Sequence, residues 1–278
     1  MPLKRLIPVV LMRNGIAVQS KGFRRYQALG NPVSIVERLS SWAADELVYL
    51  DISPDDRYDL GRDDLGASNR STALGILEDL AERTLMPLTF GGRIRTLDDA
   101  ARRIDLGADK VAVNSVMLHD PSVVTAIADR FGTQCAVVVL DAVCSEDGAW
   151  IARDPTSKQA TGRGVIELAI DAERRGAGEL IVQSVDRDGK GLGFDLSLIE
   201  AVSKAVRIPV VALGGAGTHE HLADGLAAGA DAVAAANMFN YTEHAVHKAK
   251  RALHDAGHPV REPELIEAPA LTGGSDAA

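Results

Sequence analysis

The sequence is poor in the residues that several classes of protein require. Aromatic residues make up 4% of its 278 positions, and two cysteines, Cys135 and Cys144, are too few for a disulfide framework. Acidic residues outnumber basic ones by 39 to 30, which gives a formal net charge of −9. An acidic chain with few aromatic side chains argues against nucleic-acid binding, which needs basic patches or stacking platforms.

Long hydrophobic runs are also missing. No apolar stretch reaches the roughly 18 residues that span a bilayer, and the N-terminus lacks the apolar segment of a signal peptide. Together with the low cysteine content, these absences predict a cytoplasmic protein without a membrane partner. The seven histidines, the cysteines and the acids show no spacing typical of a metal site, so we expect neither a metal nor a cofactor.

Hydrophobic residues still make up 46% of the chain, and they are arranged in alternating segments. Short apolar runs typical of buried strands recur along the chain, and helix-period stretches separate most of them. The strand-like runs are residues 6–10, 46–52, 87–90, 110–114, 136–141, 179–185, 209–215 and 232–238. This pattern predicts a (β/α)8 TIM barrel of residues 1–262 with a flexible tail at 263–278. An open doubly wound sheet is the alternative that alternation alone allows.

An internal repeat favours the closed barrel. Residues 86–115 resemble residues 208–237, and the Gly-Ala-Asp motif of the first segment recurs at the matching place in the second. Residues 44–52 resemble the segment that begins at residue 177 in the same way. A long repeat of fixed spacing predicts two half-barrels of four β/α units each.

Function in such barrels lies at the carboxyl ends of the strands, where two pairs of glycines follow predicted strands. The pairs Gly91–Gly92 and Gly214–Gly215 would let the backbone approach a phosphate at a helix N-terminus. Tight β–α turns need the same glycines, but two pairs related by the repeat favour a ligand with two phosphates. The residues placed to complete the two phosphate cradles are Asn114, Ser115, Ala236 and Asn237.

Carboxylates stand at other strand ends. Asp51 ends the second predicted strand, Asp141 ends the fifth, and Asp188 precedes Gly189 after the sixth. A carboxylate at the barrel mouth can act as an acid or a base or accept a hydroxyl, and a structural cap is the alternative. We assign catalytic roles to Asp141 and Asp51, and ligand binding to Asp188 and Gly189.

These residues, with the motifs DELVYLDI, GADKVAVNS, GAGELIVQSVDRDG and GGAG, resemble the cyclase subunit of imidazole glycerol phosphate synthase over most of the chain. The resemblance implies a barrel that receives ammonia from a glutaminase subunit and adds it to a phosphorylated ribonucleotide. In the family, two opposed aspartates at the ends of strands 1 and 5 transfer the protons. Asp141 matches the second aspartate, but Leu11 stands at the place of the first. Leucine transfers no proton, and losing a positioned acid or base typically costs about 10²–10⁴-fold in rate.

The opposite end of the predicted barrel matches the family better. Asp109 matches a residue that faces the glutaminase in the family. The four charged residues that ring the ammonia entrance of the family are matched by Arg5, Glu46, Lys110 and Glu179. An ordinary structural ring of salt bridges is the alternative. The resemblance therefore implies an intact ammonia entrance below a broken acid–base pair.

One branch of this family serves the amidation of surface-polysaccharide sugars, and Leu11 and Leu213 resemble that branch. The leading hypothesis is an ammonia-conducting subunit that works with a glutaminase, binds a phosphorylated or nucleotide-sugar ligand and supplies a separate sugar amidotransferase. The alternatives are an authentic cyclase of histidine biosynthesis, a scaffold that only activates a glutaminase, and a related sugar isomerase. Arg93, in place of a third cradle glycine, and the Asp-rich segment 53–71 would both bear on ligand binding.

Overall fold

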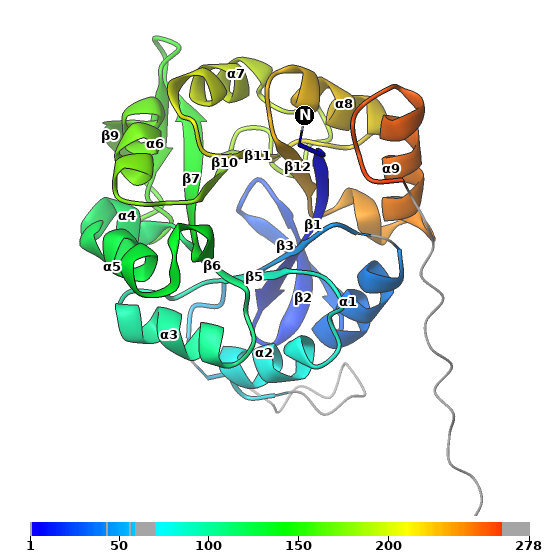
Figure 1. Ribbon diagram of the computed structural model, residues 1–278, viewed down its shortest axis with the longest axis horizontal. Helices are drawn as coiled ribbons and strands as arrows, with labels where there is room; N and C mark the ends of the chain where they lie inside the picture. The colour runs from blue at the N-terminus through cyan, green and yellow to red at the C-terminus, as the bar shows by residue number, and fades with distance from the viewer. Residues whose placement is uncertain (1, 43, 56, 59–69, 263–278) are drawn as a thin grey trace, which may run out of the picture.

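The computed structural model describes residues 2–42, 44–55, 57–58 and 70–262. Its parallel strands close into a barrel, with helices around the outside (Figure 1). Each barrel strand pairs with the next barrel strand along the chain, and the last pairs with the first. The barrel strands are β1 (Arg5–Arg13), β4 (Leu47–Asp51), β5 (Leu88–Gly91), β6 (Lys110–Val113), β7 (Ala136–Cys144), β10 (Glu179–Ser184), β11 (Val210–Leu213) and β12 (Ala232–Ala235). The predicted TIM barrel is confirmed, and closure excludes the open sheet.

Helices follow the barrel strands and cover them. Each buries an apolar stripe against the sheet, as α5 does with Val124 and Ile127, because residues three or four apart share one helix face. Side chains set several helix starts: Asn31 caps α1, and Thr96 and Asp99 form a capping box on α3. The helices are α1 (Pro32–Ser41), α2 (Ala73–Ala81), α3 (Leu97–Asp105), α4 (Ser115–His119), α5 (Ser122–Phe131), α6 (Val165–Arg174), α7 (Leu196–Ala205), α8 (His219–Ala227) and α9 (Ala245–Asp255), with short 3-10 turns η2 (Thr133–Cys135) and η3 (Met238–Asn240).

Side chains alternate between two apolar layers along each barrel strand. On β7, Val137 and Val139 belong to the cluster inside the barrel, whereas Val138 and Leu140 pack between the sheet and the helices. This two-residue period is the expected consequence of a pleated strand that is buried on both faces. The parity of a residue on its strand therefore decides whether its side chain reaches the barrel axis.

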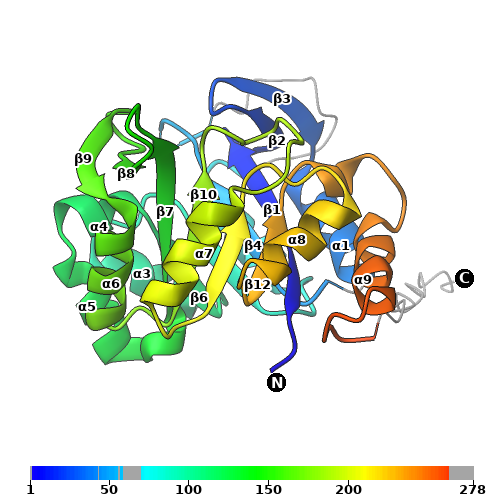
Figure 2. The same ribbon diagram turned by 90° about the horizontal axis from the view of Figure 1, so that it is seen from above.

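Two antiparallel hairpins extend the sheet at repeat-related places. The first, β2 (Ile16–Lys21) and β3 (Arg25–Gly30), follows β1, and the second, β8 (Trp150–Arg153) and β9 (Ala160–Gly164), follows β7. Figure 2 shows both hairpins on one side of the barrel and the N-terminus on the other. Each half-barrel thus opens with a strand and a hairpin, in agreement with the repeat. We did not predict the hairpins.

Two sequence predictions fall mainly outside the described residues. The flexible tail at 263–278 does so entirely, as does most of the Asp-rich segment 53–71. Within the described ranges, no helix has both the length and the apolar character needed to cross a membrane.

Candidate functional site

Leu11 and Asp141 both turn toward the barrel axis at the carboxyl ends of their strands. Leu11 has the same parity on β1 as Val9, and Asp141 has the same parity on β7 as Val139; both valines lie in the interior cluster. Leu11 itself packs against that cluster. The structure therefore places a leucine and a carboxyl where the resemblance implied two acids.

Asp141 is almost completely buried, with 3% of its surface exposed. Burial raises its pKa to about 6, while a hydrogen bond from Asn114 and the charge of Arg153 act in the opposite direction. Its neighbour across the β7–β10 pair is Gln183. A carboxyl that titrates near neutral pH is suited to proton transfer, so these contacts support the role predicted for Asp141.

Asp51 has a different environment. It follows Leu50, an interior residue of β4, so its side chain faces the helices instead of the axis. Its Oδ1 accepts hydrogen bonds from the backbone N–H of Ser53, at 2.9 Å, and from the Ser53 hydroxyl. Its Oδ2 accepts one from the Tyr58 hydroxyl at 3.1 Å. The structure does not bring Asp51 and Asp141 together, and these bonds favour a structural role for Asp51.

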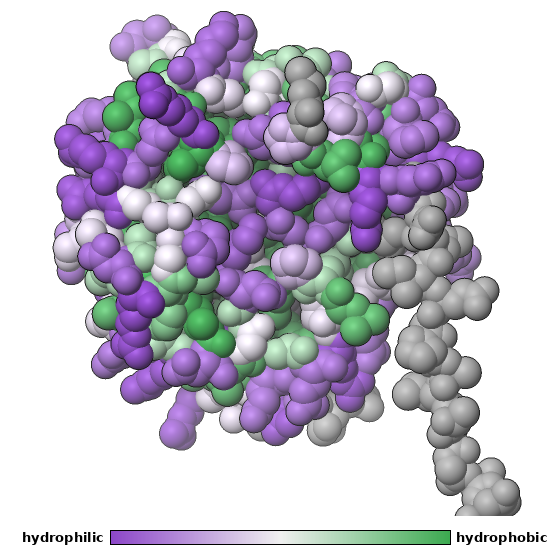
Figure 3. Space-filling view, viewed as in Figure 1, coloured by the Kyte–Doolittle hydropathy of each residue, from purple (hydrophilic) through white to green (hydrophobic). Residues whose placement is uncertain are grey.

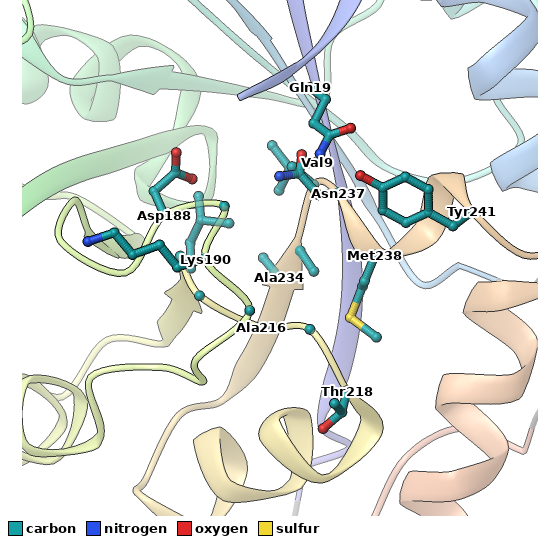
Figure 4. Close-up of a pocket in the computed structure, with 18 of the residues that line it drawn as sticks. Val9, Gln19, Asp188, Lys190, Ala216, Thr218, Ala234, Asn237, Met238 and Tyr241 are labelled. Atoms are coloured by element: carbon teal, nitrogen blue, oxygen red, sulfur yellow. The ribbon is translucent and has the colours of Figure 1, made fainter. Parts of the chain in front are cut away.

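A cavity of about 520 Å³ opens at the mouth, on the side of β10, β11 and β12. Its lining includes six residues that we predicted to bind a ligand: Asp188, Gly189, Gly214, Gly215, Ala236 and Asn237. Leu11, Gln19, Gln183 and Leu213 line it as well. Figure 4 shows Gln19, Asp188 and Asn237 around this space. The cavity thus combines apolar strand ends with backbone loops and amide side chains.

The loop after β11 has the features of a phosphate cradle. Gly214 and Gly215 have positive φ angles of 92° and 105°, and the loop leads into the N-terminus of α8. Lys190 and Lys248 also line the cavity, and neither forms an ion pair within the described residues. However, a Cβ on Gly215 would meet the carbonyl oxygen of Gly193 at 2.2 Å, so packing alone also requires this glycine.

The other predicted cradle lies outside this cavity. Gly91, Gly92, Asn114 and Ser115 are absent from its lining. A Cβ on Gly92 would meet the backbone oxygen of Asp51 at 2.2 Å, so this glycine too has a packing reason. The cavity described above therefore lies at the second cradle, and the binding of a second phosphate stays a prediction.

Arg93 holds the backbone next to the first cradle. It adopts a positive φ of 55°, which is uncommon for a residue with a side chain, and its Nε donates to the carbonyl oxygen of Ser53 at 3.2 Å. Arg103 of α3 donates to the carbonyl oxygen of Gly92 at 2.9 Å. Two arginines thus fix this loop to its surroundings.

The β2–β3 hairpin is fastened to the rim of the cavity. The Ser20 hydroxyl donates to Asp188 Oδ2 at 3.0 Å, and the Gly22 N–H donates to the Asp188 carbonyl oxygen at 3.1 Å. Asn237 Nδ2 donates to the Ser20 carbonyl oxygen at 2.8 Å. Burial raises the pKa of Asp188, and the Ser20 hydrogen bond offsets part of this rise. Sequence reasoning missed Ser20, because a lone serine in an unrecognised hairpin carries no signal.

The four predicted entrance residues form a closed ring at the other end of the barrel. Arg5 pairs with Glu46 at 2.5 Å and also with Glu179, and Lys110 pairs with each glutamate at 3.1 Å. Burial opposes the charge of Arg5, but the two glutamates outweigh it and raise the pKa of Arg5. Figure 3, viewed from the side that bears the N-terminus, shows hydrophilic side chains at the centre of this face. Each charged side chain of the ring therefore forms ion pairs with two side chains of opposite charge.

Asp109, predicted to face the glutaminase, is exposed beside this ring. Its Oδ2 accepts a hydrogen bond from the Leu88 N–H at 2.8 Å. Asp231, its counterpart in the repeat, accepts one from the Val210 N–H at 3.1 Å. The Gly-Ala-Asp motif therefore has a structural function in both halves, beside any part of Asp109 in binding a partner.

Across the described ranges, no group of three or more His, Cys, Asp or Glu side chains is arranged to hold a metal ion. The mouth cavity offers backbone groups, amide and carboxyl side chains and two lysines among its polar groups.

The fold and the site define a repeat-built (β/α)8 barrel with a ligand cavity at one end and a ring of four charges at the other. A family model described as "Histidine biosynthesis protein" matches residues 5–245. The chain is also 40% identical over 257 residues to imidazole glycerol phosphate synthase subunit HisF of Gluconacetobacter diazotrophicus, over 92% of this chain and 95% of that protein. The chain therefore belongs to the histidine biosynthesis protein family, and the family resemblance seen in its motifs is confirmed.

Proposed function

We propose that this chain is the ammonia-conducting subunit of a glutamine amidotransferase complex and that it supplies the amidation of a surface-polysaccharide sugar. The observation that carries the proposal is the contrast between the two ends of the barrel. The charged ring is complete, whereas Leu11 stands across the barrel from Asp141. A barrel that retains its entrance and lacks one of two acids is suited to passing ammonia on, not to closing a ring.

Leu11 also suits an ammonia exit on physical grounds. Leu11 and Leu213 line the inner part of the mouth cavity, together with Val9. Apolar walls penalise ammonium, because a charge loses hydration there, but they penalise neutral ammonia much less. A carboxylate at position 11 would instead favour the charged form. The leucine thus helps to keep ammonia neutral as it leaves.

A glutaminase would dock on the face that carries the ring. The name of the HisF relative describes a subunit of a synthase, which supports an assembly of this kind. Leu3 and Leu85, at the amino-terminal side of β1 and β5, are 58% and 74% exposed. Two exposed leucines near Asp109 and the ring give this face both apolar and charged contacts, as protein interfaces commonly have.

The mouth cavity would receive the ligand of the complex. The glycine loop after β11 and the side chains of Lys190 and Lys248, which form no ion pair with the described part of the chain, support a phosphate or a nucleotide-sugar diphosphate there. The separate sugar amidotransferase is proposed from the family branch alone.

An authentic cyclase of histidine biosynthesis is the second candidate. The buried Asp141 with a pKa of about 6 favours it, because one acid of the required kind is in place. This candidate needs a second acid at the barrel axis. Asp51 does not fill this place, because its side chain faces the helices.

The first test is turnover of the histidine-pathway ribonucleotide by the purified protein with excess ammonium chloride, followed by absorbance. We expect no turnover by the wild type and a gain of at least about 100-fold over background in Leu11→Asp, the lower limit for a restored acid. Leu11→Asn is the matched control, because an amide has nearly the shape of the carboxyl but cannot act as the missing acid, and it should stay inactive. Turnover by the wild type would refute the proposal in favour of the cyclase.

A second test addresses the delivery of ammonia itself. Glutamine labelled with ¹⁵N at its amide, the partner glutaminase and the sugar amidotransferase would be combined with and without this chain. The proposal predicts that label enters the amidino group of the sugar only when the chain is present. Equal labelling in its absence would contradict it.

A further inference from the structure

Lys250, on α9, is a charged residue with no exposed surface. Lysine is almost never fully buried unless it is paired. Its Nζ lies 2.6 Å from Oδ1 of Asp45, the residue directly before Glu46 of the charged ring. Burial lowers the pKa of Lys250, and the contact with Asp45 counteracts this effect. The proposed mechanism makes no use of this buried ion pair.

Asp45 joins β1, which begins at the ring residue Arg5, to the segment before β4 that carries the ring residue Glu46. Its Oδ2 accepts a hydrogen bond from the Leu6 N–H at 2.9 Å, and its own N–H donates to the Leu6 carbonyl oxygen at 3.4 Å. Leu6 directly follows Arg5. Both contacts extend the pairing of β1 and β4 to the level of the ring, so they hold Arg5 and Glu46 next to each other.

The C-terminal segment of the described chain also contacts the residues next to Arg5 and Glu46. Arg261 Nε lies 3.3 Å from Asp45 Oδ1, and Arg261 also donates to the Ala44 carbonyl oxygen at 3.3 Å. The Lys4 N–H donates to the Pro259 carbonyl oxygen at 2.7 Å. The residues that flank Arg5 and Glu46 are therefore attached to α9 and to the segment that follows it.

We propose that Lys250 is a positioning residue of the ammonia entrance: through Asp45 it keeps Arg5 and Glu46 in the geometry that the ring requires. The inference rests on the proposed function, because the ring matters only where ammonia passes. Without the amine of Lys250, Asp45 loses its most buried partner and turns toward Arg261, whose side chain is half exposed. The hydrogen bond from the Leu6 N–H to Asp45 then weakens, and Arg5 and Glu46 are no longer held at the separation that their ion pair requires.

Hydrogen exchange of the full-length protein tests the structural part. In Lys250→Met we expect the backbone amides of Leu6 and Asp45 to exchange at least about fivefold faster, the factor for one ordinary hydrogen bond. Arg251→Met is the matched control, since Arg251 is the next residue on α9 and is exposed. A lysine that served only to attach α9 would speed exchange in α9 and leave the Leu6 amide unchanged, which would overturn the inference. Should Lys250→Met not fold, Asp45→Asn provides the same readout at Leu6.

The functional part is measured in the complex with the glutaminase, with the histidine-pathway ribonucleotide as acceptor in the Leu11→Asp background. We expect Lys250→Met to lower glutamine-driven turnover at least about fivefold relative to turnover with ammonium chloride. General destabilisation would lower both rates together, and an unchanged ratio would overturn the inference. If the parent shows no glutamine-driven turnover at all, the proposed function fails and the role of Lys250 at an entrance fails with it.

Discussion

Asp141 should make the folded protein less stable at neutral pH. Replacing it by asparagine measures the size of this loss in the free energy of unfolding. Its pKa of about 6, against an ordinary value of 3.8, makes ionised Asp141 unfavourable in the folded state by about 3 kcal/mol. Between about pH 4 and pH 6, the folded protein keeps a proton that the unfolded chain releases. Stability therefore falls as the pH rises through this window, and below it the two states carry the same proton.

Urea unfolding of the wild type and of Asp141→Asn at pH 4 and pH 7.5 provides the measurement. We expect the variant to be about 2–3 kcal/mol more stable than the wild type at pH 7.5, with most of this advantage absent at pH 4. Asn114 can still donate to the new side-chain oxygen, so the substitution leaves this hydrogen bond in place. Asp129→Asn, on the exposed side of α5, is the control and should show no such difference. An advantage of equal size at both pH values would refute the reasoning, because it would come from packing and not from ionisation.

Two further predictions concern buried polar groups. Lys110→Met leaves the two glutamates of the ring with Arg5 as their only cation, and it should lower the free energy of unfolding in urea by about 3 kcal/mol. Adding Glu179→Gln removes one of the two negative charges and should recover much of this loss. Strictly additive effects of the two substitutions would contradict an interaction between these side chains. Tyr58→Phe removes the hydroxyl that donates to Asp51 Oδ2 and should cost about 1–2 kcal/mol; a neutral effect would show that water replaces it.

The barrel could be predicted from the sequence because two signals agreed. Buried parallel strands give continuous apolar runs, and the repeat fixed where each unit begins. The hairpins gave no such signal. Strand β3 has no buried residue, and β9 is also exposed or partly buried along its length. The first hairpin is held by contacts such as Ser20 with Asp188, between residues far apart in the chain. Local sequence patterns do not contain such contacts.

The sequence predicted which residues stand at the strand ends of the candidate site, but not which of their side chains face the barrel axis. Asp51 and Asp141 both stand at strand ends, yet only Asp141 shares the parity of its interior neighbours. The parity was present in the sequence, as Leu50 and Asp51 are adjacent and must face opposite sides. What the sequence did not contain was the side of β4 that faces the axis, which depends on how the strands pack. The glycine loops were ambiguous for a similar reason, because Gly92 and Gly215 are required by close backbone contacts as well as by a cradle.

Leu11 and Asp141 stand at equivalent places in the two half-barrels, and the difference between them is informative. The buried Asp141 lowers the stability of the folded protein at neutral pH. A leucine at position 141 would fill the same interior space without this electrostatic cost, so packing does not explain the acid. Residues that oppose folding are typical of functional sites, where activity requires a group that stability alone would remove. The pair therefore supports a mouth that still uses one acid and has no need of two. Under the proposed role, such a mouth would pass ammonia on and would need no second acid.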